Sequence, residues 1–190
     1  MSLKKVLRQK IEAHRPRTTR LMKEFGKVKI DEVTIDQCIG GARDIRALVT
    51  DISYLDPQEG IRFRGKTISE TFEMLPKAEG SNYPTVEAFW FFLLTGEVPN
   101  EEQLEAVMLE FKARQHVPHY VFEIIRAMPI DTHPMTMLST GILAMQKDSV
   151  FHEFYSSGQF NKNTAWEYAH ADAFDIAARI PVLAAYTYNL

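Results

Sequence analysis

Arginines at alternate positions mark the stretch "GIRFRG", residues 60–65. Side chains two positions apart in a β-strand point the same way, so we expect Arg62 and Arg64 on one face and Ile61 and Phe63 on the other. Two guanidinium groups held side by side could clamp a carboxylate or a phosphate. Charges at every second position also occur on the solvated face of an exposed strand. The spacing alone favours the solvated strand and leaves the anion clamp open.

The histidines and the single cysteine are the next candidates for chemistry. His116 and His119, with His133 nearby, are spaced only loosely like metal ligands, and Pro118 disfavours a helical pair at i, i+3. We therefore predict surface or helix-capping roles for these histidines and no metal site. Cys38 has no CxxC partner and no nearby base, so it is predicted to be a structural thiol.

Sequence motifs of catalysis and phosphate binding are missing. There is no GxGxxG motif and no Walker loop, and Gly40-Gly41-Ala42-Arg43 is too short to count as a phosphate cradle. No Ser-His-Asp or Cys-His set can be assembled from the chain. The remaining helical histidines, such as His170, suit capping, ion pairing or partial burial. The residues by themselves predict a soluble helical domain without a complete active site.

Composition narrows the class of protein. A chain of 190 residues that is 45% hydrophobic can bury a substantial core as one domain, or as a domain with an arm. A net charge of -3 argues against non-specific nucleic-acid binding. No apolar run reaches the roughly 18 residues of a membrane span. One cysteine excludes an internal disulfide framework and fits a reducing compartment.

Three segments must position these side chains, and the first two are short. Residues 1–26 are predicted to form an amphipathic arm helix, broken or bent near Pro16, because apolar residues recur at helical spacing. Residues 27–66 are predicted to form a small β ribbon, because β-branched residues alternate with polar ones around 48–55. Turns are expected at Gly40-Gly41 and at "DPQEG", where proline, aspartate and glycine each favour turn geometry.

Residues 67–190 are predicted to form at least six helices. Thr67 and Glu70 make a capping box, and Asn100 with Gln103 repeats the signal before a later helix. A helix over 86–94 is apolar on all sides, which predicts burial on every side, and Gly96 ends it.

Two later helices carry many small residues. One begins at Pro134, continues to about Lys147, and is expected to use Met135, Leu138, Ile142 and Met145 as one apolar face. The last begins near Thr164, holds seven alanines between 169 and 185, and should bend at Pro181. Small side chains let helices approach closely, so both helices should pack tightly.

Several stretches, taken together, resemble citrate synthases of the eukaryotic-type branch. They occur in the family's order and at its spacing: "GGARDIRALVTDISYLDPQEGIRFRGKTI", "LPKAEG", "EAFWFFLLTGEVPNEEQ", "HPMTMLSTGILAMQKDSVF" and "WEYAHADAFDIAARIPVLAAYTYNL". The resemblance covers essentially the whole chain but only about the first two-fifths of a family member. It implies a mainly α fold, the multi-helical large domain with a small N-terminal β ribbon, and a chain that stops before the small domain.

The resemblance also implies an activity. Family members are acyltransferases of the tricarboxylic acid cycle that condense oxaloacetate with acetyl-CoA and water to citrate and CoA, without a resident cofactor. Arg43 and Lys162 match positions that reach the phosphates of coenzyme A, although the family commonly has arginine at the second position. No catalytic residue carries over, so the 190-residue chain alone is expected to be inactive. Arg62 and Arg64 are expected to pair with helix carboxylates.

The resemblance further implies a homodimer through the helices over 134–147 and 164–190. Two alternatives stay open, namely a 2-methylcitrate synthase acting on propionyl-CoA and a non-catalytic helical dimerisation module. A eukaryotic source would place the protein in the mitochondrial matrix. The start carries acidic residues, which transit peptides avoid, and this favours a bacterial, cytoplasmic protein.

Overall fold

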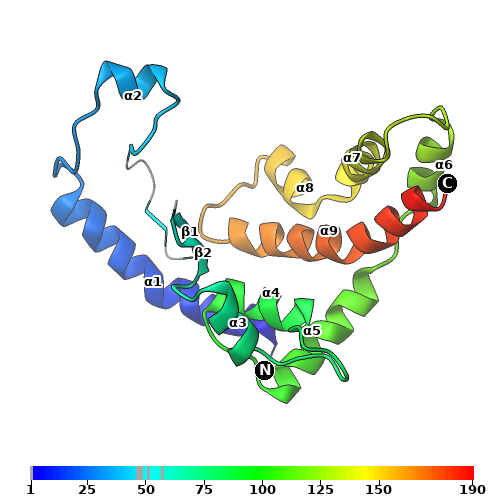
Figure 1. Ribbon diagram of the computed structural model, residues 1–190, viewed down its shortest axis with the longest axis horizontal. Helices are drawn as coiled ribbons and strands as arrows, with labels where there is room; N and C mark the ends of the chain where they lie inside the picture. The colour runs from blue at the N-terminus through cyan, green and yellow to red at the C-terminus, as the bar shows by residue number, and fades with distance from the viewer. Residues whose placement is uncertain (1, 46–48, 51, 57) are drawn as a thin grey trace. The chain divides into compact units, whose positions relative to one another are not determined.

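The fold is mainly helical, as predicted. The computed structural model describes residues 2–45, 49–50, 52–56 and 58–190, and the chain divides into two compact units, Met1–Leu104 and Glu105–Leu190. Within the described ranges, helices α1 to α9 dominate and the strands form one two-stranded sheet (Figure 1). No helix in this part of the chain is long and apolar enough to cross a membrane.

The first unit holds the arm, the ribbon and two helices that pack beside them. Its elements are α1 (Leu3–Phe25), α2 (Ile35–Ile39), β1 (Ser53–Asp56), β2 (Gly60–Phe63), α3 (Ile68–Met74), α4 (Val86–Thr95) and the start of α5 (Glu101–Arg114). Leu3 and Val6 of α1 are buried, as the helical spacing predicts. The predicted break near Pro16 is wrong, because α1 continues through this residue as one helix.

The β ribbon of the structure is shorter than the predicted range of residues 27–66. β1 pairs with β2 in antiparallel register, with Tyr54 opposite Arg62. Ahead of the strands lies α2, a helix that the β-like composition concealed. Thr34 and Gln37 form a complete capping box at its start, the same signal that correctly predicted α3. Leu48 and Asp51 of the predicted alternation lie outside the described residues.

The turn between the strands forms as expected around its polar and glycine residues. One carboxylate oxygen of Asp56 accepts hydrogen bonds from the backbone N–H groups of Gln58 and Glu59, each at 2.8 Å. Gly60 has φ 88°, which side-chain-bearing residues rarely adopt. These hydrogen bonds hold the pKa of Asp56 below its ordinary value of 3.8. Pro57, the proline of the predicted turn, lies outside the described residues.

Helices α3 and α4 begin and end largely where the sequence indicates. The Thr67–Glu70 capping box is present, and Gly96 ends α4 in the left-handed conformation at φ 76°. Phe92 is buried and packs with Leu75 and Ala88. The prediction that α4 is buried on every side is wrong at its first residue, since Val86 is 71% exposed within this chain.

The second unit is a set of helices around one core. It contains the rest of α5, α6 (His119–Arg126), α7 (Pro134–Ala144), the 3₁₀ helix η1 (Met145–Asp148), α8 (Val150–Ser156) and α9 (Ala165–Tyr188). The core cluster is made by Val117, Val121, Ile125, Met137, Met145 and Leu183. α9 continues through Pro181 as one helix. The prediction of at least six helices after residue 66 is therefore confirmed within the described residues.

The predicted apolar face of α7 is confirmed in part. Met145 is buried and Leu138 and Ile142 pack against the core cluster, whereas Met135 is 59% exposed. Met137 and Gly141 are buried as well. At Gly141 the helix lies close to α9, because a Cβ atom added there would lie 2.8 Å from Cδ2 of Leu183. Gly141 therefore serves the packing of this unit, not a contact on an outer surface.

Candidate functional site

The two arginines of "GIRFRG" have separate partners. Arg62 donates to a carboxylate oxygen of Glu59 and, at 3.1 Å, to the carbonyl oxygen of Gly65. Glu59 lies in the turn between the strands, so the helix carboxylate predicted for Arg62 is not its partner. Bonding with Glu59 raises the pKa of Arg62 above its usual value.

Arg64 lies beyond the end of β2, in a left-handed conformation with φ 51°. Its side chain reaches the C-terminal end of α4, where Nε and Nη2 donate to the carbonyl oxygens of Leu93 and Leu94, each at 2.9 Å. The last carbonyl groups of a helix lack intrahelical donors and carry partial negative charge. Arg64 therefore caps α4 through backbone oxygens. The two guanidinium groups do not form a joint clamp.

Arg43 lies in a tight turn that directly follows α2. Its flanking residues Ala42 and Asp44 have positive φ values of 60° and 57°, which costs free energy for residues other than glycine. The side-chain amide of Gln37 holds the turn by donating to the carbonyl oxygen of Arg43 at 3.2 Å. The Arg43 side chain is exposed. A strained turn thus presents one solvent-accessible guanidinium group.

Lys162 lies in the loop between α8 and α9, and its side chain is exposed. The neighbouring Asn161 organises this loop, because its side-chain oxygen accepts from the N–H of Asn163 at 2.9 Å. Phe160 fixes the other side by packing against Phe154, with ring centroids 5.8 Å apart. Lys162 therefore extends from a loop that is held at both sides. These contacts of Asn161 and Phe160 were not predicted from the sequence, although an asparagine ahead of a helix is a recognisable turn signal.

A second polar network, around Asp172 of α9, was also missed. Its carboxylate accepts from the hydroxyl of Ser149 at 2.5 Å and from the backbone N–H groups of Val150 and Phe151 at 2.9 and 3.2 Å. The first N–H groups of a helix need such acceptors. Asp172 thus joins the start of α8 to α9.

Arg114 makes the corresponding connection between α5 and α9 within the second unit. Its guanidinium group bonds Asp175 at 2.8 Å and Glu110 at 3.0 Å, and lies 5.8 Å from the centre of the Phe174 ring. Although partial burial opposes the charged form, the hydrogen bond with Asp175 helps to raise the pKa of Arg114. The arrangement is that of a structural ion pair.

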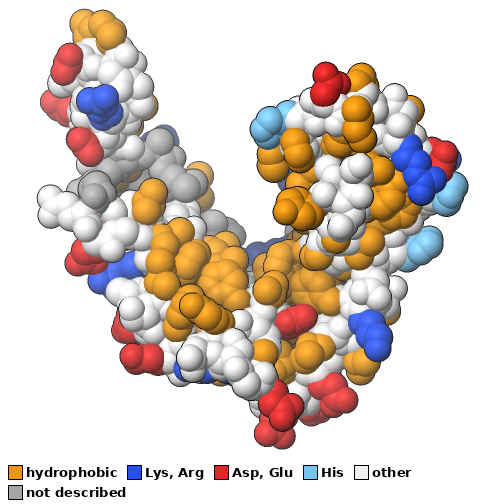
Figure 2. Space-filling view, turned by 45° about the vertical axis from the view of Figure 1, so that its right-hand side comes forward, with side chains coloured by type: hydrophobic (Ala, Val, Ile, Leu, Met, Phe, Trp, Pro, Cys, Tyr) orange, Lys and Arg blue, Asp and Glu red, His pale blue; other side chains and the backbone are white. Residues whose placement is uncertain are grey.

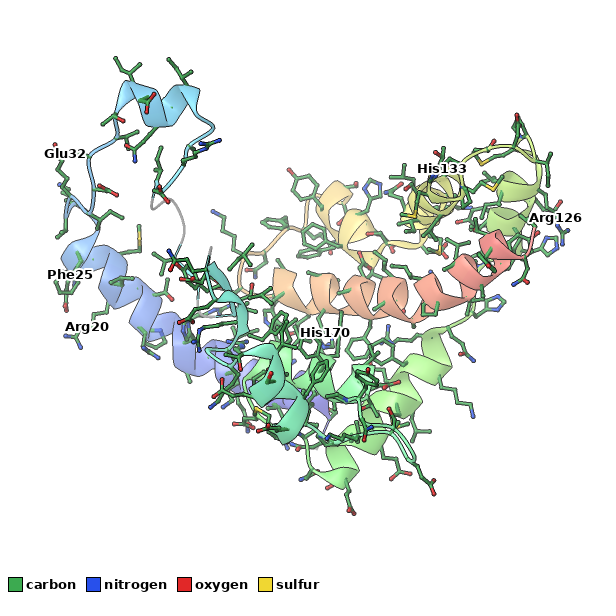
Figure 3. All side chains as sticks on the ribbon, in the orientation of Figure 1. Arg20, Phe25, Glu32, Arg126, His133 and His170 are labelled. Carbon is green, nitrogen blue, oxygen red and sulfur yellow. The ribbon has the colours of Figure 1, made fainter. Side chains whose placement is uncertain are left out.

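His133 and His119 take the helix-capping and surface roles that the sequence predicts. His133 is the N-cap of α7 and accepts from the N–H of Met135 at 3.2 Å (Figure 3). His119 lies 3.6 Å from Glu123 on the exposed side of α6, and His170 is buried on α9. No group of three potential metal ligands occurs in the described ranges. Cys38 is exposed on α2, so it does not pack in the core of this chain.

Arg43 and Lys162 belong to different units, and each can offer one cation to an anionic ligand. A family model described as "Citrate synthase, C-terminal domain" matches residues 41–190. The chain belongs to the citrate synthase family. Arg43 and Lys162 both lie inside the matched range, while α1 and α2 precede it.

Curated citrate synthases align with nearly the whole chain. The mitochondrial citrate synthase of Aspergillus niger is 41% identical over 99% of this chain and 39% of its own length. That of Neurospora crassa is 46% identical over 89% of the chain and 36% of its length. That of Saccharomyces cerevisiae is 40% identical over 99% of the chain and 39% of its length. The chain therefore spans about two-fifths of the length of these citrate synthases.

Proposed function

We propose that this chain is part of a citrate synthase, an acyltransferase that condenses oxaloacetate with acetyl-CoA and water and releases citrate and CoA. The observation that carries the proposal is the extent of the alignment. Relatives named citrate synthase match 99% of this chain at 40–41% identity, so the likeness is not confined to a shared motif. Their names also favour citrate synthase over the two alternatives left open by the sequence.

Within such an enzyme, we propose that Arg43 and Lys162 contact the phosphates of coenzyme A. Both side chains are exposed cations, and both extend from backbone that neighbouring hydrogen bonds or ring contacts hold in place. A charged donor held in this way loses little conformational freedom when it binds phosphate. Lysine supplies the charge without the two-pronged geometry of arginine. No further cofactor is proposed, because the reaction needs only its two substrates and water.

We also propose that the enzyme is a homodimer and that α7 and α9 contribute to the interface. Both helices carry large apolar side chains at the surface of the unit, including Leu143 at 74% and Ile176 at 42% exposure. Hydrophobic side chains are visible on the surface in Figure 2. Burial of such side chains favours association. Gly141 of α7 is not part of the proposed interface, since it is buried against Leu183.

The expectation of a bacterial, cytoplasmic protein receives no support from the relatives. Those of Aspergillus niger, Neurospora crassa and Saccharomyces cerevisiae are all named as mitochondrial. We therefore propose the mitochondrion as the location of the enzyme.

A coenzyme A release assay on the full-length parent enzyme tests the function. With oxaloacetate present, acetyl-CoA should release CoA much faster than propionyl-CoA does, whereas the 190-residue chain should release none above the uncatalysed rate. A preference for propionyl-CoA would contradict the proposal and favour a 2-methylcitrate synthase.

The same assay tests the CoA contacts. Arg43→Ala should raise the Michaelis constant for acetyl-CoA roughly tenfold or more, because a charge-assisted hydrogen bond is worth about 1.5–3 kcal/mol, and should leave that for oxaloacetate nearly unchanged. Lys162→Arg should retain or improve acetyl-CoA binding. Arg20→Ala, on α1, is the control and should change neither constant. An unchanged acetyl-CoA constant in Arg43→Ala would return Arg43 to a structural role.

A further inference from the structure

The turn that presents Arg43 is strained, so other residues must hold it in place. Gly41, Ala42 and Asp44 have φ values of 83°, 60° and 57°. Glycine adopts such values freely, whereas residues with a side chain keep them only where neighbouring contacts hold the backbone. Without those contacts, Ala42 and Asp44 would relax toward negative φ, and the side chain between them would change direction. The direction of the Arg43 side chain therefore depends on the residues that hold the turn.

Gln37 of α2 holds the turn through two hydrogen bonds. Its backbone carbonyl oxygen accepts from the N–H of Ala42 at 2.8 Å. Its side-chain Nε2 donates to the carbonyl oxygen of Arg43 at 3.2 Å. Gln37 is half-buried, while Asp36 and Cys38 on either side of it are exposed. One residue of α2 thus fixes the backbone on both sides of the Arg43 side chain.

The amide of Gln37 is also anchored at its other atom. Oε1 accepts from the backbone N–H of Thr34 at 3.0 Å and from its hydroxyl at 3.2 Å. The amide cannot rotate without breaking one of these sets of bonds. A glutamate would complete the capping box equally well, as Glu70 does at the start of α3. Capping therefore does not explain the Nε2 donor, which serves the turn alone.

We propose that Gln37 is a positioning residue for the contact between Arg43 and the phosphates of coenzyme A, an inference that rests on the function proposed for Arg43. Gln37 does not touch the phosphate. It holds the backbone from which the guanidinium group extends, so that less conformational freedom is lost on binding. Guanidinium–phosphate bonds are directional, so loss of this support should weaken acetyl-CoA binding while the charge remains. The effect should appear in the Michaelis constant for acetyl-CoA and not in kcat.

A double-mutant cycle in the full-length parent enzyme, measured by coenzyme A release, tests the proposal. Gln37→Met removes the donor without changing the charge and should raise the Michaelis constant for acetyl-CoA roughly threefold to tenfold, the worth of one neutral hydrogen bond. The constant for oxaloacetate and kcat should stay nearly unchanged. Added to Arg43→Ala, Gln37→Met should have no further effect, because no guanidinium group is left to position. The control Gln103→Met makes the same change in the Asn100–Gln103 capping box of α5 and should alter neither constant.

Gln37→Glu separates the support of the turn from the capping of α2. Its carboxylate can still accept from Thr34 but cannot donate to the carbonyl oxygen of Arg43. This variant should raise the Michaelis constant for acetyl-CoA at least as much as Gln37→Met does. The N–H of Ala42 should also exchange with solvent faster in both variants, in the absence of any substrate. A wild-type constant in Gln37→Glu would overturn the proposal.

The outcomes distinguish this inference from the function on which it rests. If Arg43→Ala alone leaves the Michaelis constant for acetyl-CoA unchanged, the phosphate contact fails and the positioning role fails with it. If Arg43→Ala raises that constant and Gln37→Met does not, only the positioning role fails. Additive effects of the two substitutions would show that Gln37 acts independently of Arg43, which also overturns the proposal. If circular dichroism shows that Gln37→Met unfolds, Gln37→Glu takes its place in the cycle, with Gln103→Glu as its control.

Discussion

The Nε of Arg64 donates to the carbonyl oxygen of Leu93 at 2.9 Å, across 29 positions of sequence. With the second bond to Leu94, this contact ties the end of the β ribbon to the end of α4. Arg64→Ala should therefore lower the free energy of unfolding by about 2–3 kcal/mol, since it removes two charge-assisted hydrogen bonds. Arg64→Gly should cost less than Arg64→Ala, because glycine adopts the left-handed conformation without strain. Urea denaturation followed by circular dichroism measures both.

Arg62→Ala is the matched control, because Arg62 lies two positions away and bonds the nearby Glu59 and Gly65. Arg62→Ala should lower the free energy of unfolding clearly less than Arg64→Ala does. Equal losses for Arg62→Ala and Arg64→Ala would show that capping of α4 is not the source of the stabilisation.

Gly141→Leu should destabilise the second unit by about 3 kcal/mol through overpacking. The added side chain would meet Leu183 and Ile125, which are fully buried and have no room to move away. Ser139→Leu introduces the same side chain at an exposed position of α7 and should leave the melting temperature nearly unchanged. Thermal unfolding of both variants tests the contact. A melting temperature of Gly141→Leu equal to that of the wild type would disprove it.

Asp172→Ala should lower the free energy of unfolding by about 1–2 kcal/mol, in the range found for lost helix caps. It leaves the Ser149 hydroxyl and two backbone N–H groups at the start of α8 without their acceptor. Amide hydrogen exchange should show faster exchange confined to α8 and the loop to α9. Asp131→Ala, at an exposed position outside these contacts, should not change exchange there. Unchanged protection of α8 in Asp172→Ala would contradict the capping role.

The Asp56 carboxylate should make the ribbon sensitive to acid. Its pKa is lower in the folded chain than the ordinary 3.8, because the N–H groups of Glu59 and Gln58 bond the charged form. The folded state therefore binds protons less readily, so this stabilisation is present above the unfolded pKa and is lost as pH falls through the folded value. Asp56→Asn should weaken that dependence. A carboxyl titration of Asp56 by nuclear magnetic resonance at or above 3.8 would refute the prediction.

Local signals predicted helix boundaries well and packing poorly. The capping pairs Thr67–Glu70 and Asn100–Gln103 form as expected, because they involve only residues three apart. The same pattern at Thr34 and Gln37 marks α2, but the surrounding β-branched residues concealed it. On α7, Leu138, Ile142 and Met145 pack in the core as predicted, but hydrophobic size could not show that α9 approaches closely enough to need glycine at 141.

The candidate site was predictable only through family resemblance. Composition and spacing do not distinguish Arg43 and Lys162 from other exposed cations of the chain. The contact of Asp172 with Ser149 depends on where the start of α8 meets α9 in space, and no local pattern in the sequence contains that information. Arg64 shows the same limit, because its alternation with Arg62 suggested one strand face while its backbone leaves the strand.

The boundary between the two units falls inside α5, between Leu104 and Glu105. Proteases cut chains that can be drawn out into an extended form, and a helix must first unwind to allow this. Leu104 packs against the cluster of Leu75 and Phe92, so unwinding there would disturb the first unit. Limited digestion should therefore open the chain first in exposed stretches such as residues 27–34, and residues 35–190, with the boundary inside α5 uncut, should be recovered on one fragment.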